Sequence, residues 1–118
     1  MNEKMASRIL RTLSREKTFY FFTSIGNYTG QSASSLKDFM DKINEVNVKS
    51  LEFHFCRGDF EKWIAEVLED KALAEYIRKL QQQDLTGDKL RIQLHKTISK
   101  RYNRLKNQSN NKLNPTFF

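Results

Sequence analysis

The sequence predicts an all-α fold, an irregular bundle of five or six helices. Glycine and proline are scarce, at four and one of 118 residues, and sandwiches and barrels need more turn residues than that. Hydrophobic residues also recur at helical spacing along most of the chain. Because 38% of the residues are hydrophobic and 30% are charged, the chain is globular and long enough to bury one core.

Residues 4–17 are expected to form the first helix, because Met5, Ile9 and Leu13 fall on one stripe. A separate basic stripe consists of Lys4, Arg8, Arg11 and Arg15. Residues 18–25 are rich in aromatic side chains without a helical period, so they are either a short strand or an extended buried segment. Residues 26–30 follow as a turn, since Gly and Asn tolerate positive φ.

The second helix begins after Ser35, an N-cap residue with Asp38 three positions later. Its apolar face is Leu36, Phe39, Met40, Ile43 and Val46. Residues 51–57 alternate like a strand, yet Ser50 is typical of a helix start. We expect a helix, because a lone strand would have little to pair with.

Gly58 and Asp59 separate two helices, with Gly58 in the left-handed C′ position and Asp59 as the next N-cap. The helix that follows has an apolar face of Phe60, Trp63, Ile64, Val67 and Leu68. Asp70 is expected to cap another helix. The residues of that helix predicted to point inward are Leu73, Tyr76, Ile77 and Leu80.

Thr86 is expected to cap a long last helix of roughly twenty residues. One face consists of Leu90, Leu94, Ile98, Tyr102 and Leu105. The opposite face carries Lys96, Lys100 and Arg104. Residues 1–106 are therefore assigned to a single helical domain, and residues 107–118, which are Asn-rich and include a proline, to a frayed C-terminal tail.

One motif joins the third and fourth predicted helices, with the pattern F-H-x-x-R-G-D-F-x-x-W-I followed by D-x-x-L-A. Its main residues are His54, Arg57, Gly58, Asp59, Phe60 and Trp63. Over residues 18–80 the chain resembles a prokaryotic, mainly archaeal, domain family of unknown function. That family also accompanies other proteins, including sugar-metabolising ones, so the resemblance implies a regulatory or interaction module.

The net charge of +7 is concentrated at the C-terminal end. Residues 87–118 hold eight basic residues against Asp88 alone, and residues 1–17 hold five against two acidic ones, so residues 18–86 are net acidic. The candidate phosphate-binding residues are Arg8, Arg11, Arg15, Lys96, Lys100, Arg101 and Arg104. Such clusters favour anionic partners, although a solvated helix face, or one docked on the acidic centre, explains them equally well.

No catalytic residue, metal site or cofactor is predicted. His54 and Cys56 would point about 200° apart on a helix, and we expect both to be core or rim residues. Arg57, Asp59 and Glu61 could hold an anion, but helix capping by Asp59 and an ion pair of Arg57 with Glu61 or Asp70 explain them better. One cysteine and two histidines give neither a disulfide framework nor a zinc set.

The first ten residues lack the apolar segment of a signal peptide, and no apolar run approaches the ~20 residues that span a bilayer. We therefore expect a cytoplasmic protein with no membrane association. The expected function is a non-enzymatic interaction or regulatory domain with a protein partner. The alternative is a basic nucleic-acid-binding protein that contacts phosphates through the N-terminal and long C-terminal helices.

Overall fold

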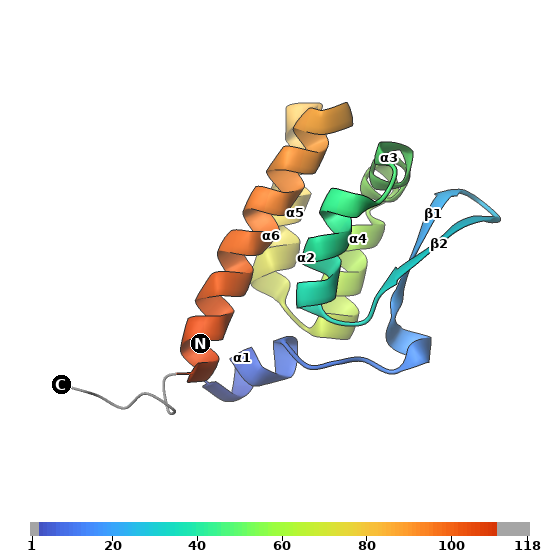
Figure 1. The fold of residues 1–118 in the computed structure, drawn as a ribbon. Coiled ribbons are helices and arrows are strands. Elements are labelled where there is room, and N and C mark those ends of the chain that lie inside the picture. Colours follow the sequence, from blue (N-terminus) through green and yellow to red (C-terminus); the bar gives the residue numbers. More distant parts are fainter. Residues whose placement is uncertain (1–2, 111–118) are drawn as a thin grey trace.

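The computed structural model describes residues 3–110, which form six α-helices and a two-stranded antiparallel sheet (Figure 1). The helices are α1 (Glu3–Ile9), α2 (Leu36–Glu45), α3 (Val48–Arg57), α4 (Asp59–Trp63), α5 (Lys71–Leu80) and α6 (Gly87–Asn110). The strands are β1 (Phe19–Ser24) and β2 (Asn27–Ala33). The shorter turns are η1 (Arg15–Lys17), the π-helical η2 (Ile64–Leu68) and η3 (Gln81–Gln83). The fold is mixed α/β, although mostly helical, so the all-α prediction was wrong.

The error lies in the residues assigned to a turn. Gly26, at φ 82°, forms the hairpin bend, but the chain continues from Asn27 as β2. Tyr20 pairs with Ser32 and Phe22 with Tyr28, so β2 has extra residues between these pairs. Gly30, at φ 86°, lies within this bulge. A glycine that looks like a turn residue therefore interrupts a strand, and the aromatic segment has a partner strand after all.

The N-terminal helix is also shorter than predicted, because α1 ends at Ile9 rather than near residue 17. Tertiary contacts take the chain away from helical geometry. The backbone N–H of Leu13 donates to the carbonyl of Ser34 at 2.7 Å, and the Leu13 side chain is buried. Residues 10–18 thus run along the end of the bundle to the start of β1 (Figure 1).

The predicted helix ends at Ser35, Gly58 and Asp70 are confirmed, but α3 begins at Val48 with Asn47 as its N-cap, so Ser50, which was expected to start this helix, lies inside it. Residues 51–57 belong to α3, whose C-cap Gly58 is left-handed at φ 76°. Ser35 Oγ accepts from the Asp38 N–H at 3.1 Å, and Asp70 accepts from the Leu73 N–H at 3.1 Å. The helix α6 continues through Asn110, and residues 111–118 of the predicted tail lie outside the described residues.

An aromatic cluster forms the centre of the core. The Phe19 ring lies 4.9 Å from the Phe21 ring, 5.6 Å from Phe39, 5.4 Å from Phe60 and 5.5 Å from Trp63, between ring centroids. These rings come from β1, α2 and α4, so the cluster holds the hairpin against the helices. On the other side of the bundle, α6 packs against α1, α2, α3 and α5 (Figure 1).

Candidate functional site

A groove between α5 and α6 is lined by all four of the candidate phosphate-binding residues predicted on the last helix. The two helices lie side by side and run in opposite directions (Figure 1). The groove has a volume of about 390 Å³. Its lining residues are Tyr76 and Lys79 from α5, and Gln93, Lys96, Thr97, Lys100, Arg101 and Arg104 from α6. None of these residues is acidic.

The spacing of the α6 residues follows from helix geometry. Lys96, Lys100 and Arg104 are four residues apart, which places them on one face with about 6 Å of axial rise between neighbours. Their side chains are exposed. The three cations therefore form a row of roughly 12 Å along the groove, and Lys79 adds a fourth positive charge from α5.

These four cations have no carboxylate partner among residues 3–110, since no ion pair involves Lys79, Lys96, Lys100 or Arg104. Like charges at i and i+4 of a helix are destabilising by about 0.2–0.5 kcal/mol per pair. The row thus carries a small cost in the unliganded protein. A bound polyanion would convert this repulsion into attraction.

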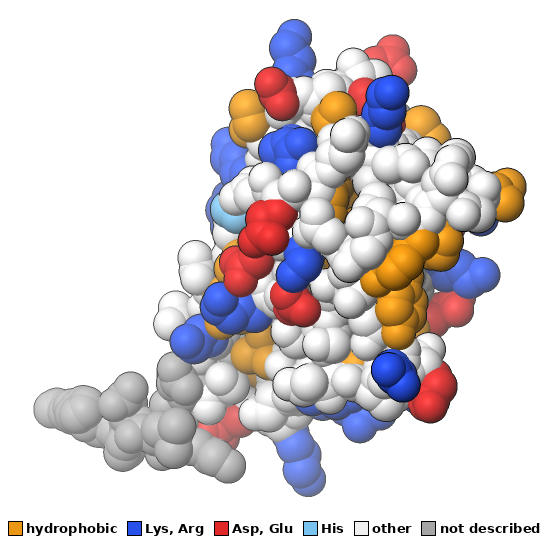
Figure 2. All heavy atoms as spheres, turned by 45° about the vertical axis from the view of Figure 1, so that its right-hand side comes forward, with side chains coloured by type: hydrophobic (Ala, Val, Ile, Leu, Met, Phe, Trp, Pro, Cys, Tyr) orange, Lys and Arg blue, Asp and Glu red, His pale blue; other side chains and the backbone are white. Residues whose placement is uncertain are grey.

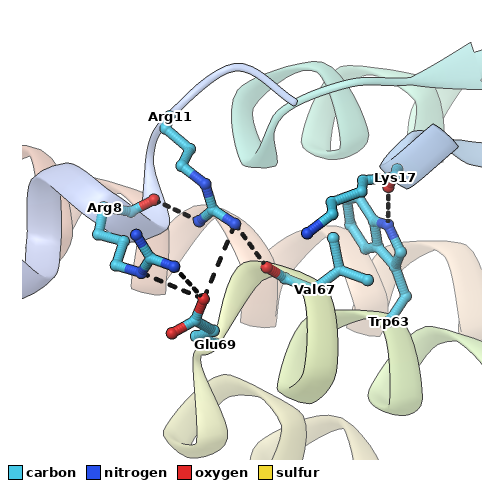
Figure 3. A network of polar contacts seen from close by, with 6 residues as sticks. All are labelled: Arg8, Arg11, Lys17, Trp63, Val67 and Glu69. Atoms are coloured by element: carbon cyan, nitrogen blue, oxygen red, sulfur yellow. Dashed lines mark hydrogen bonds and ion pairs between the residues drawn. The ribbon is translucent and has the colours of Figure 1, made fainter. Parts of the chain in front are cut away.

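Arg8 and Arg11 in the N-terminal segment form contacts within the chain (Figure 3). Arg8 donates from Nη2 to Glu69 Oε2 at 2.6 Å, and this hydrogen bond holds the pKa of Glu69 below its usual range. Arg11 donates to the carbonyl of Val67 at 2.8 Å and to that of Arg8 at 2.7 Å. The two guanidinium groups hold residues 8–11 against the end of η2, and neither lines the groove.

The two other candidate phosphate ligands, Arg15 and Arg101, do not add a free charge to the groove. Arg15 is exposed in η1 and does not line the groove. Arg101 is buried and forms a two-pronged ion pair with Asp70, at 2.8 Å and 2.9 Å. Its charge is therefore neutralised inside the protein. Of the seven residues predicted, the groove collects three with an unpaired charge: Lys96, Lys100 and Arg104.

Four groove residues were missed by sequence reasoning: Tyr76, Lys79, Gln93 and Thr97. Tyr76 was predicted to point inward, but its side chain is 44% exposed. The buried positions of α5 are instead Leu73, Ala74, Ile77 and Leu80, and Tyr76 lies beside this stripe. A strict helical stripe through Leu73, Ile77 and Leu80 would have placed Tyr76 at its edge. Lys79 gave no separate signal, because one lysine at a helix end is commonplace.

The motif residues have a structural arrangement around His54. The backbone N–H of Phe22 donates to His54 Nε2 at 2.9 Å, so Nε2 carries no proton. The proton is on Nδ1, which lies 2.8 Å from Asp59 Oδ2. Burial lowers the pKa of His54, while the hydrogen bond to Asp59 acts in the opposite direction. The neutral imidazole thus joins β1 to the α3–α4 corner.

This arrangement corrects the roles predicted for Asp59 and Arg57. Asp59 makes no capping hydrogen bond and is instead the partner of His54. Arg57 pairs with Asp59 at 3.2 Å, not with Glu61 or Asp70, and lies over the Phe53 ring. His54 is buried as expected, whereas Cys56 is exposed. A second hollow of about 530 Å³ adjoins His54 and Arg57, and within residues 3–110 the one side chain hydrogen-bonded to the imidazole is that of Asp59.

Two further findings concern the described residues as a set. Within residues 3–110, no three His, Cys, Asp or Glu side chains are placed to hold a metal ion together. No helix in the same range combines the length and the hydropathy of a membrane-spanning segment.

Comparisons with protein-family models, curated proteins and solved structures found no match to this chain. The family resemblance over residues 18–80 therefore stays a prediction.

Proposed function

We propose that the protein is a small non-enzymatic binding domain that holds the sugar–phosphate backbone of a nucleic acid in the α5–α6 groove. One observation carries the proposal: four cations without carboxylate partners line one groove whose described lining includes no acidic residue. Lys and Arg side chains that neutralise phosphates release condensed counterions, which makes binding favourable and salt-dependent. Gln93 and Thr97 add an amide and a hydroxyl group that can bond to the backbone.

The number of cations sets the expected salt dependence. If the four groove cations each neutralise one phosphate, the slope of log affinity against log salt is about −2.8 for a single strand and about −3.6 for duplex DNA. Raising the salt from about 50 to 200 mM would then weaken binding roughly 50-fold and 150-fold, respectively. A variant with only one cation left in the groove would lose only about threefold over the same range.

The test is fluorescence anisotropy with labelled mixed-sequence DNA and RNA oligonucleotides at the two salt concentrations. The groove variant combines Lys96→Ala, Lys100→Ala and Arg104→Ala. A matched control removes three exposed lysines outside the groove, with Lys17→Ala, Lys49→Ala and Lys62→Ala. Both variants lose three positive charges, so net charge alone affects them equally. The proposal fails if no oligonucleotide binds at the lower salt, or if the two variants bind equally.

A protein-binding role is the second candidate, and the exposed side of the hairpin favours it. Figure 2 shows this side, with hydrophobic side chains gathered over it and charges of both signs interspersed around them. Ile25 at the hairpin bend is 84% exposed, and Tyr28 is also exposed. An interaction through this surface would survive high salt and be lost in Ile25→Asp, whereas binding through the groove would behave in the opposite way.

A further inference from the structure

We infer that the α5–α6 groove takes a single strand rather than a duplex, with Tyr76 stacking on an unpaired base. This inference rests on the proposed function and adds the class of nucleic acid that the groove selects. Three features of the described residues carry it: the concave shape of the site, the state of the Tyr76 side chain, and the position of that ring among the cations.

The shape of the site is unsuited to a duplex. Proteins that read duplex DNA with a helix insert that helix into a major groove about 12 Å wide. Here the cations of α6 line a hollow shared with α5, and α6 also packs against α1, α2 and α3. The cations of α6 thus face a hollow shared with α5 instead of a convex helix surface, and a hollow between two helices can follow one strand.

Two polar aromatic side chains of the described residues donate hydrogen bonds to the backbone, and Tyr76 is not one of them. The Tyr20 hydroxyl donates to the carbonyl of Arg15 at 2.8 Å, and the Trp63 indole donates to that of Lys17 at 2.8 Å. The Tyr76 hydroxyl, like that of Tyr28, has no hydrogen bond within residues 3–110, but the Tyr28 ring lies against the rings of Tyr20 and Phe22, whereas the Tyr76 ring lines the groove. Tyr102, the tyrosine of α6, is instead partly buried against the core.

The Tyr76 ring lines the same groove as the four cations. Lys79 follows Tyr76 by three residues on α5, so the two share a face, and the row on α6 lies across the groove. Aromatic rings set among cations are the usual platform for single strands, because every base has a face that stacks while the cations hold the adjacent phosphates. A paired base in a duplex offers no such face.

The experiment compares a mixed-sequence single strand of twelve or so nucleotides with a hairpin duplex of the same sequence, by anisotropy at about 50 mM salt. Three variants are used: Tyr76→Ala, Tyr76→Phe and Tyr76→Leu. Loss of one stacked base weakens binding by about 5- to 150-fold. We expect that loss on the single strand for Tyr76→Ala and Tyr76→Leu, with Tyr76→Phe close to the native protein. Duplex affinity should be weaker and unchanged in all three.

The outcomes separate this inference from the function on which it rests. Absence of binding to any nucleic acid overturns both. Binding that depends on Lys96, Lys100 and Arg104 but is equal for single strand and duplex, or is unaffected by Tyr76→Ala, overturns the stacking inference alone. Equal binding of poly-glutamate, unaffected by Tyr76→Ala, would show that the groove accepts any flexible polyanion and would overturn both. The exposed position of Tyr76 on α5 keeps all three variants foldable.

Discussion

The ion pair between Asp70 and Arg101 gives the prediction with the largest effect. The two side chains are 1% and 6% exposed. Arg101 donates from Nε to Asp70 Oδ2 at 2.8 Å and from Nη2 to Oδ1 at 2.9 Å. Asp70 Oδ1 also accepts from the Leu73 N–H at the start of α5. One buried carboxylate therefore fixes α6 and caps α5.

Replacing Arg101 with Met removes the guanidinium and leaves the Asp70 carboxylate buried with a single backbone donor. Breaking a buried pair in this way costs about 3–5 kcal/mol, a large part of the roughly 5–15 kcal/mol by which domains are stable. Asp70→Asn should cost a similar amount, because it keeps the cap but removes the carboxylate charge from the buried ion pair with Arg101. In the double variant no charge is left unpaired, and its loss should be smaller than the sum by at least about 2 kcal/mol.

Urea unfolding of the four proteins, followed by far-UV circular dichroism, measures this cycle. A loss below about 1 kcal/mol for Arg101→Met would equate the pair with an exposed one and refute the reasoning, as would strict additivity in the double variant. The double variant, which removes both charges of the pair, should also leave the salt slope of oligonucleotide binding unchanged, because the pair is neutral in the native protein. This outcome separates Arg101 from its neighbours in the groove.

Three further predictions concern single residues. Burial lowers the pKa of His54 in the folded protein, so below about pH 6.5 the unfolded chain takes up the proton more readily, and stability should fall as pH falls. Urea midpoints between about pH 5 and 8 should show this slope and should lose it in His54→Gln; a rise in stability on acidification would mean that Asp59 outweighs burial. Gly58→Ala should cost about 1–2 kcal/mol, because Gly58 has a φ of 76°, and an unchanged urea midpoint would contradict this. Lys100→Glu should raise stability by about 1 kcal/mol, because it turns two repulsive i,i+4 pairs into attractive ones, while nucleic-acid affinity falls; a variant that binds as tightly as the native protein would argue against the groove.

The parts of the fold that sequence predicted well are those fixed by local rules. Ser35 and Asp70 cap their helices, and Gly58 ends α3 in a left-handed conformation. Local rules failed where distant residues decide. The hairpin exists because β1 packs on α3 and the aromatic cluster. The helix α1 ends early because the backbone N–H of Leu13 donates a hydrogen bond to the carbonyl of Ser34. The spacing of hydrophobic residues over 4–17 contains no information on this contact with a distant residue.

The candidate site was predicted in part for the same reason. Periodicity placed Lys96, Lys100 and Arg104 on one face of a helix, and α6 has them so. Periodicity cannot tell which charges find a partner across the fold. Arg8 and Arg101 look equivalent to the groove residues in sequence, yet Glu69 and Asp70 pair with them from distant positions. The groove itself needs α5 beside α6, which only the structure provides.

The most direct test of the central claim is to locate the bound oligonucleotide on the protein. Amide chemical shifts of ¹⁵N-labelled protein, titrated with a short single strand at low salt, report the contacted residues. The account predicts that the largest shifts occur along the α5–α6 groove, at residues 76–79 and 93–104. Shifts confined to the hairpin and the α3–α4 corner, or no shifts at all, would contradict it.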